Sequence, residues 1–136
     1  MKEYWLDATN VALRFVLGEP GELAEKALAV FRGAEEGKWR LVVHPLVIAE
    51  IFYVLTRFYK KPKDAVARTL LELLALPGVK ALERRSVTKA LERAGKGPLS
   101  FTDAFLAEKA EATGSPVASF DEKLRKAALA ELPLDP

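Results

Sequence analysis

The sequence has no cysteine, and its 136 residues include only one histidine and one methionine. A chain without cysteine forms neither a disulfide bond nor a cysteine-based zinc site, and it is compatible with a reducing cytoplasm. No apolar run approaches the roughly 18 residues that a membrane-spanning helix needs. Residues 1–3 also lack the layout of a signal peptide. We therefore expect a cytoplasmic protein that does not cross a membrane.

An excess of one charge is also missing, because 21 Lys and Arg residues oppose 19 Asp and Glu residues and leave a net charge of +2. Net charge alone therefore does not indicate a nucleic-acid-binding protein. Half of the residues are hydrophobic and 29% are charged, a composition typical of a globular chain. The length suits one ordinary domain, and the sequence contains no internal repeat, low-complexity tract or linker. We predict a single domain over residues 1–136.

Short apolar runs alternate with amphipathic stretches along the chain. The runs predict strands at residues 4–6, 39–43, 79–82 and 116–119. The amphipathic stretches predict helices at residues 11–17, 22–36, 46–59, 64–76, 86–94, 101–113 and 121–131. Strands that alternate with helices indicate an α/β fold, in which a mostly parallel sheet is covered on both faces.

Asp7 and Asp121 each follow a predicted strand. In an open α/β sheet, ligands bind outside the carboxyl ends of the strands, which is where both side chains would project. Asp7 could instead cap the first helix, as could the polar residues that follow it. Ser119 and Glu122 could form a capping box by themselves, which would leave Asp121 free.

Glu50 is the only charged residue among residues 46–55, within the most apolar predicted helix. A helix that is apolar all round is buried, and an unpaired buried carboxylate is strongly destabilising. Glu50 therefore needs a cation, a proton or a metal ion. The structural alternative is a buried ion pair with Arg14 or Arg57.

Asp103 lies in the first turn of the helix predicted to begin at residue 101. Ser100 and Asp103 fit a capping box in which Ser100 is the N-cap. Asp103 also shares a helical face with Ala107 and Ala110, which indicates a packed side of the helix.

In a parallel sheet with returning helices, the four acids are expected at the same end. Carboxylates that converge in one cleft repel each other unless a hard divalent cation lies among them. Oxygen ligands, no cysteine and one histidine favour Mg²⁺ or Mn²⁺ over zinc. The pattern therefore predicts a metal site made of Asp7, Glu50, Asp103 and Asp121.

The four acids, in this order, resemble the motifs of the PIN domain, and within it those of the VapC-like toxins of type II toxin–antitoxin pairs. The first motif is matched by Leu6-Asp7-Ala8-Thr9 and by residues 13–20, and the later motifs by Ala49-Glu50, Thr102-Asp103-Ala104 and Ser119-Phe120-Asp121. Many relatives have Asn where Thr9 stands here, so either Thr9 or Asn10 could fill that polar role. The hydroxyl that often precedes the fourth acid is kept by Ser119.

The resemblance implies a PIN-like three-layer α/β/α sandwich, with about four to five mostly parallel strands and helices on both faces. It implies an endoribonuclease in which the four acids, assisted by Thr9, hold Mg²⁺ or Mn²⁺. The metal would activate a water that attacks an RNA phosphodiester. Arg14 is the first candidate for an RNA contact, because the family motif carries a basic residue there. The resemblance also implies a cognate antitoxin as a partner.

We further predict a homodimer. The apolar helix that contains Ile51, Phe52, Val54 and Leu55 and the Ala/Leu-rich helix at residues 64–76 carry more hydrophobic surface than one small core obviously needs. The alternative is that these side chains are simply core. Trp5, Trp39 and Phe101 could stack on bases, although packing in the core is favoured.

Two other classes of protein remain open. One is a different Mg²⁺-dependent phosphohydrolase that acts on a small phosphate ester. The haloacid-dehalogenase type begins with Asp-x-Asp, but Thr9 stands where the second Asp should be. The other class is a non-catalytic PIN-like interaction domain whose acids are structural.

Overall fold

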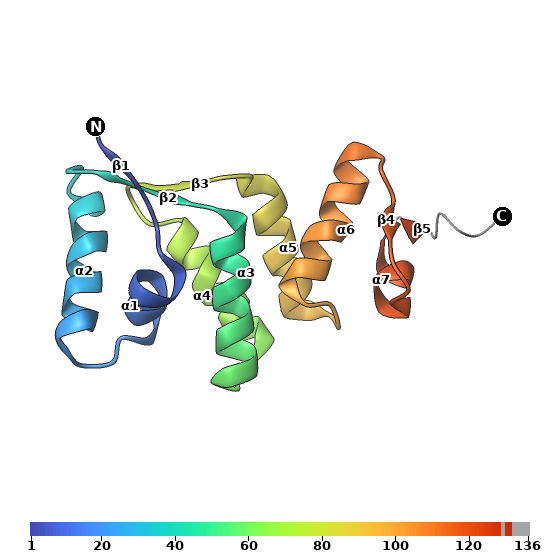
Figure 1. Cartoon of the computed structure of the whole chain (residues 1–136), viewed down its shortest axis with the longest axis horizontal. Coiled ribbons are helices and arrows are strands. Elements are labelled where there is room, and N and C mark those ends of the chain that lie inside the picture. The colour runs from blue at the N-terminus through green and yellow to red at the C-terminus, as the bar shows by residue number, and fades with distance from the viewer. Residues whose placement is uncertain (129, 132–136) are drawn as a thin grey trace.

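The computed structural model describes residues 1–128 and 130–131 (Figure 1). Strands β1 (Glu3–Trp5), β2 (Arg40–Val43) and β3 (Val79–Ala81) form a parallel sheet in the order β1-β2-β3. Three consecutive residues of β2, Leu41–Val43, are all buried. Because successive side chains of a strand point to opposite faces, helices must cover both faces of the sheet there. The structure confirms the predicted α/β fold with three layers.

The helices occupy most of the positions that the apolar periodicity indicates. They are α1 (Leu13–Leu17), α2 (Glu22–Glu35), α3 (Pro45–Tyr53), α4 (Lys63–Leu74), α5 (Arg84–Lys96), α6 (Phe101–Thr113) and α7 (Glu122–Ala127). Two short π-helical turns, η1 (Ala8–Ala12) and η2 (Val54–Phe58), precede α1 and follow α3. The start of α3 is fixed because Pro45 suits a first turn and His44 Nδ1 accepts from the Leu46 amide at 3.0 Å.

The inward side of α3 and η2 is core. Ile48, Ile51, Phe52 and Leu55 are each at most 3% exposed and belong to one hydrophobic cluster with α4, α5 and the sheet. Burial of an apolar side chain of this size stabilises the folded state by about 1.5–3 kcal/mol relative to an exposed one. The interpretation that Ile51, Phe52 and Leu55 are surplus surface for a dimer is therefore wrong, because these side chains are buried inside the chain.

The last two strands stand apart from the main sheet. β4 (Val117–Ala118) and β5 (Ala130–Glu131) pair in parallel with each other and make a second, two-stranded sheet. The five strands of the described residues thus divide into sheets of three and two, where one sheet was expected. The helix predicted to run to residue 131 ends at Ala127 instead. In Figure 1 the unit of β4, α7 and β5 lies at the opposite end of the molecule from β1 and α2.

The longest helices of the described residues are amphipathic segments of ordinary length. Within residues 1–128 and 130–131, no helix is both long enough and apolar enough to cross a membrane.

Candidate functional site

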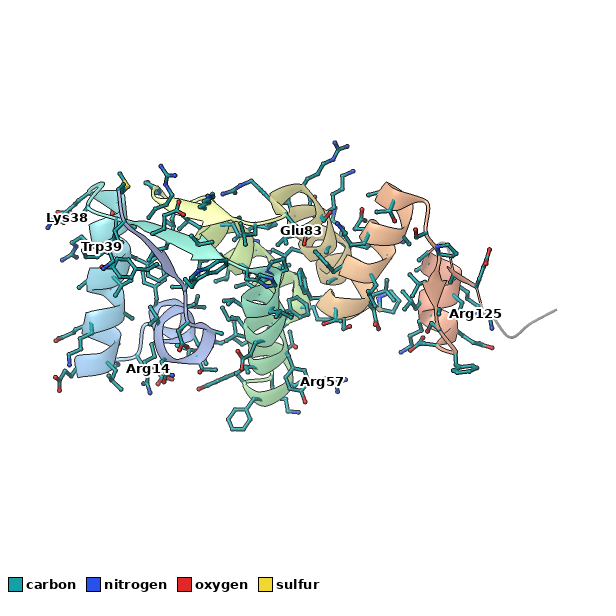
Figure 2. The ribbon with its side chains drawn as sticks, turned by 45° about the horizontal axis from the view of Figure 1, so that its top comes forward. Arg14, Lys38, Trp39, Arg57, Glu83 and Arg125 are labelled. Atoms are coloured by element: carbon teal, nitrogen blue, oxygen red, sulfur yellow. The ribbon has the colours of Figure 1, made fainter. Side chains whose placement is uncertain are left out.

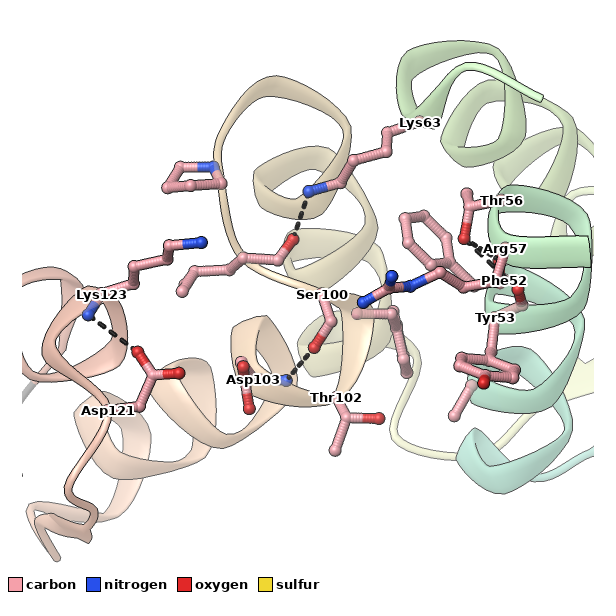
Figure 3. A pocket seen from close by; sticks show the side chains of 14 residues that line it. Phe52, Tyr53, Thr56, Arg57, Lys63, Ser100, Thr102, Asp103, Asp121 and Lys123 are labelled. Atoms are coloured by element: carbon pink, nitrogen blue, oxygen red, sulfur yellow. Dashed lines mark hydrogen bonds between the residues drawn. The ribbon is translucent and has the colours of Figure 1, made fainter. Parts of the chain in front are cut away.

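A cavity of about 580 Å³ lies between α3–η2, the beginning of α6 and the beginning of α7. Tyr53 and Arg57 line one side of it, and Asp103, Asp121 and Lys123 line the other (Figure 3). The cavity therefore brings together two of the four predicted site acids.

Asp103 reaches the cavity from the first turn of α6. Ser100 is the N-cap, and its hydroxyl oxygen accepts a hydrogen bond from the Asp103 backbone amide at 3.2 Å. The predicted capping arrangement is thus confirmed for Ser100, and the half-buried Asp103 carboxylate still lines the cavity. A carboxylate in a first turn is also favoured by the helix dipole.

Asp121 reaches the same cavity from the beginning of α7. Its Oδ1 accepts from the backbone amides of Lys123 at 2.8 Å and Leu124 at 3.3 Å, so Asp121 is itself the N-cap. The hydroxyl of Ser119 accepts from the Asp121 amide at 3.0 Å. The idea that Ser119 caps this helix and leaves Asp121 free is therefore wrong. The carboxylate nevertheless remains exposed to solvent at the cavity.

Three cationic side chains share this cavity. Arg57 extends from η2 toward the start of α6, and Lys123 lies beside Asp121 (Figure 3). Lys63 donates from Nζ to the carbonyl oxygens of Gly97 at 2.8 Å and Leu99 at 2.6 Å. Burial lowers the pKa of Lys63, and the nearby charge of Lys123 lowers it further. The cavity thus combines two carboxylates with an excess of positive charge.

Glu50 lies on α3 but is exposed, contrary to the expectation that it is buried. The sequence pattern misled because the turn of α3 that carries Glu50 leaves one face in solvent while Ile48 and Ile51 face the core. Among the residues that the structure describes, no ion pair joins Glu50 to Arg14 or Arg57. Glu50 also lies outside the lining of the Asp103–Asp121 cavity.

Asp7 follows β1, as predicted, and is exposed. Its Oδ1 accepts from the Asn10 amide at 3.0 Å and caps η1. The carboxylate borders a different, mostly apolar hollow of about 340 Å³ between β1 and α2. The described chain therefore does not bring Asp7 together with Asp103 and Asp121.

Thr9, Asn10 and Arg14 border a third hollow, of about 450 Å³, with the loop between α1 and α2. Arg14 projects from α1, whereas Arg57 projects from η2, beyond the end of α3 (Figure 2). Of these two arginines, only Arg57 shares a cavity with Asp103 and Asp121.

The fit of a divalent metal can be judged from the carboxylates. Oxygen donors of Asp103 and Asp121 have the chemistry that Mg²⁺ and Mn²⁺ prefer. Within residues 1–128 and 130–131, however, no three His, Asp or Glu residues are grouped closely enough to hold a metal ion. The predicted four-acid site is therefore not assembled by one chain in this conformation.

Four lining residues, Tyr53, Arg57, Lys63 and Lys123, are not among the site residues predicted from the sequence. Tyr53 and Arg57 lie one helical turn apart and so share a face, a spacing that is visible in the sequence. Lys63 and Lys123 belong to lysine-rich stretches that normally indicate a solvated surface. Only the fold shows that these segments lie against the start of α6.

A family model of the PIN domain matches residues 6–129. No curated protein and no solved structure matches the chain significantly. PIN domains are generally nucleases that act on nucleic acid, and they commonly depend on a divalent metal. The matched segment covers all four motif acids and nearly the whole chain, and the chain therefore belongs to the PIN domain family.

Proposed function

We propose that this protein is an endoribonuclease of the VapC-like toxin type, which hydrolyses RNA phosphodiesters with Mg²⁺ or Mn²⁺ at Asp7, Glu50, Asp103 and Asp121. The observation that supports it best is the cavity in which two of these acids, Asp103 and Asp121, lie beside cationic side chains, within a chain of the PIN family. We place this activity in the cytoplasm.

The cations of the cavity suit an RNA backbone. Phosphate contacts from Lys and Arg supply most of the affinity of such interfaces, and a guanidinium can hold a phosphate with two hydrogen bonds. Arg57 and Lys123 are exposed at the cavity and free to make such contacts. Arg14 and Thr9 border a separate hollow, so we propose Arg57 ahead of Arg14 as the principal phosphate contact.

Tyr53 favours single-stranded or looped RNA as the substrate. Its side chain is 64% exposed at the edge of the cavity. An exposed aromatic ring stacks on an unpaired base, whereas the bases of a duplex are already stacked on each other. Tyr53 lies one turn from Arg57, so one nucleotide can contact both.

Metal dependence requires more than the two acids of the cavity. When bound, Mg²⁺ or Mn²⁺ would supply a water of lowered pKa and stabilise the leaving oxygen. Asp103 and Asp121 would hold it from one side. At least one further acid must then be brought to the same place, and the inference below concerns Asp7.

A comparison of substrates tests this function. The purified protein is incubated with single-stranded RNA, DNA of the same sequence and p-nitrophenyl phosphate, each with Mg²⁺, Mn²⁺ or EDTA. We expect RNA alone to be cut, and EDTA to stop the reaction. Turnover of p-nitrophenyl phosphate would favour a small-ester phosphohydrolase, and RNA binding without hydrolysis would favour an interaction domain.

We also propose a small antitoxin as a partner. Phe58 is 79% exposed and lies beside Tyr59, which is 39% exposed, and adjoining exposed apolar side chains can form a patch that binds another protein. Co-expression with the product of the neighbouring gene should yield a complex that does not cut RNA. Phe58→Ala should weaken that inhibition, and Leu28→Ala, which removes an exposed apolar side chain from α2, should leave it intact.

A further inference from the structure

β1 and β4 each have an edge without a neighbouring strand among residues 1–128 and 130–131. On β1, the Lys2 carbonyl accepts from the Arg40 amide, and the Leu6 amide donates to the Val42 carbonyl. Because alternate residues of a parallel strand bond to alternate sides, the backbone groups of Glu3 and Trp5 point toward the open edge. This edge can accept another parallel strand.

The sheet face at β1 carries an apolar hollow and an exposed tryptophan. Trp5 is 69% exposed, which is unusual for the largest apolar side chain in a parallel sheet, and the expectation that it packs in the core is wrong. Together with Tyr4, Leu6 and Leu41 it borders the hollow of about 340 Å³ beside Asp7. Native proteins normally cover an open strand edge like that of β1, or place charged side chains on it.

The unit of β4, α7 and β5 has too few strands to form a stable sheet by itself. It contains a two-stranded ribbon of two residues per strand, and an isolated ribbon of that kind is marginal in water. Phe120, directly after β4, is 81% exposed. The unit is held to the rest of its own chain by α6 and by a hydrogen bond from Arg93 to the Ala127 carbonyl.

The predicted site acids are divided between the two sheets, as the strands are. Asp7 follows β1, while Asp121 follows β4 and shares its cavity with Asp103. If β4 lay parallel to β1, both aspartates would stand at the carboxyl ends of adjacent strands. Asp7 is four residues after Glu3, and Asp121 is four residues after Val117, so pairing of Glu3 with Val117 puts the two acids level.

We propose that β4 of a second copy of this chain adds in parallel to β1, and that the exchange is reciprocal. Each site then joins Asp7 of one chain to Asp103 and Asp121 of the other, which makes three carboxylates where one chain provides two. The catalytic role of this composite site rests on the function proposed above. The pairing of β4 with β1 is independent of that function.

A second copy fits better than closure within one chain. Closure would pull the β4–α7–β5 unit away from α6 and Arg93 and carry it to the opposite end of the molecule (Figure 1). Exchange between two copies keeps those contacts and covers the edges of both chains at once. Such swapping is a low-cost route to a two-fold dimer.

Engineered cysteines test the strand pairing directly, because the chain has no cysteine of its own. Adjacent strands lie about 4.8 Å apart, within the range that a disulfide spans. After mild oxidation, Glu3→Cys/Val117→Cys should migrate as a covalent dimer without reductant and as a monomer with it. The single variants, and Glu3→Cys/Thr113→Cys with its second thiol at the end of α6, should stay monomeric.

The competing arrangements give different results in this experiment. A disulfide formed within one chain would overturn the exchange and support closure in one chain. Two thiols that both remain free would overturn any pairing of β4 with β1. Because the readout is covalent linkage, it decides the inference even if the protein proves not to cut RNA.

Mixing two inactive variants tests the composite site itself. Asp7→Asn and Asp121→Asn are unfolded together, refolded and assayed on RNA. Random pairing makes half of the dimers mixed, each with one intact site, so about one quarter of wild-type activity should return. Asp7→Asn mixed with the double variant Asp7→Asn/Asp121→Asn should stay inactive. If the first mixture also stays inactive while the wild type cuts RNA, the composite site is wrong.

Discussion

At the scale of single residues, the cations of the cavity have separate tasks. Lys63 serves the fold, because its ammonium group donates to the Gly97 and Leu99 carbonyls that precede α6. Arg57 and Lys123 are exposed and available to a ligand. Charge counts along the sequence cannot separate these tasks, because the partners of Lys63 are more than thirty residues away.

Replacement of Lys63 should therefore change stability. Lys63→Met removes the donor to two carbonyls and should lower the free energy of unfolding by about 1–3 kcal/mol. Lys61→Met, which changes an exposed lysine outside the cavity, is the control. Urea denaturation measures both variants, and equal stability of the two would contradict the role given to Lys63.

The stability of the wild type and of Lys63→Met should also depend differently on pH. Burial lowers the pKa of Lys63 in the folded state below its ordinary value of 10.5. Between the lowered value and 10.5 the unfolded chain binds more protons, so this group makes the wild type more stable as pH rises. Urea midpoints recorded across that range should show this rise in the wild type and a smaller one in Lys63→Met. The same pH profile for both proteins would refute the assignment.

Arg57 should affect RNA affinity without affecting the fold. Arg57→Ala should weaken binding of all single-stranded RNA sequences alike and reduce the slope of log K against log salt by about 1, since one phosphate contact is lost. Arg68→Ala removes an exposed arginine of α4, paired with Asp64, and should bind as the wild type does. Fluorescence anisotropy in EDTA measures both, and an unchanged salt slope in Arg57→Ala would rule out that contact.

At the scale of elements, the sequence predicts where most helices lie but not how some of them end. The helix expected to begin at residue 86 begins at Arg84, whose guanidinium donates to the Leu74 carbonyl at 3.0 Å. Residues 130–131 continue a helical pattern, yet they form β5, because pairing with β4 overrides the local preference. In both cases a contact from outside the segment decides the boundary.

Two glycines near α2 oppose a larger side chain for different reasons, one by its backbone angle alone and the other also by close packing. Gly37 and Gly78 both adopt left-handed backbones, with φ of 78° and 81°. A Cβ on Gly37 would meet nothing within 4 Å, whereas one on Gly78 would lie 2.4 Å from the Ala34 carbonyl oxygen.

Substitution of each glycine should therefore have a different cost. Gly37→Ala should be destabilising by about 1–2 kcal/mol, the strain of a left-handed alanine. Gly78→Ala adds a forced displacement of α2 and should lose about 1–3 kcal/mol more. Thermal and urea denaturation compare the two, and equal losses would show that α2 and β3 do not approach as closely as described.

At the scale of the whole molecule, the sequence predicts the acids and the parallel strands but not which strands are neighbours. Asp7 and Asp121 were expected to meet because strands of one sheet end at one edge. The structure instead places them on separate sheets. The order of strands depends on long-range packing, and no local pattern in residues 1–10 or 115–122 encodes it. The prediction that Glu50 is buried is wrong for a related reason, since its exposure depends on which face of α3 the other helices cover.

The central claim is that RNA is cut at a site that needs the carboxylate of Asp121. Asp121→Asn and Glu122→Gln change adjacent acids at the start of α7. Asn is as good an N-cap as Asp, so both variants should keep the fold. We measure cleavage of single-stranded RNA with Mn²⁺ by both variants and the wild type. The account predicts loss of cleavage in Asp121→Asn and wild-type cleavage in Glu122→Gln. Cleavage by Asp121→Asn at the wild-type rate would contradict it.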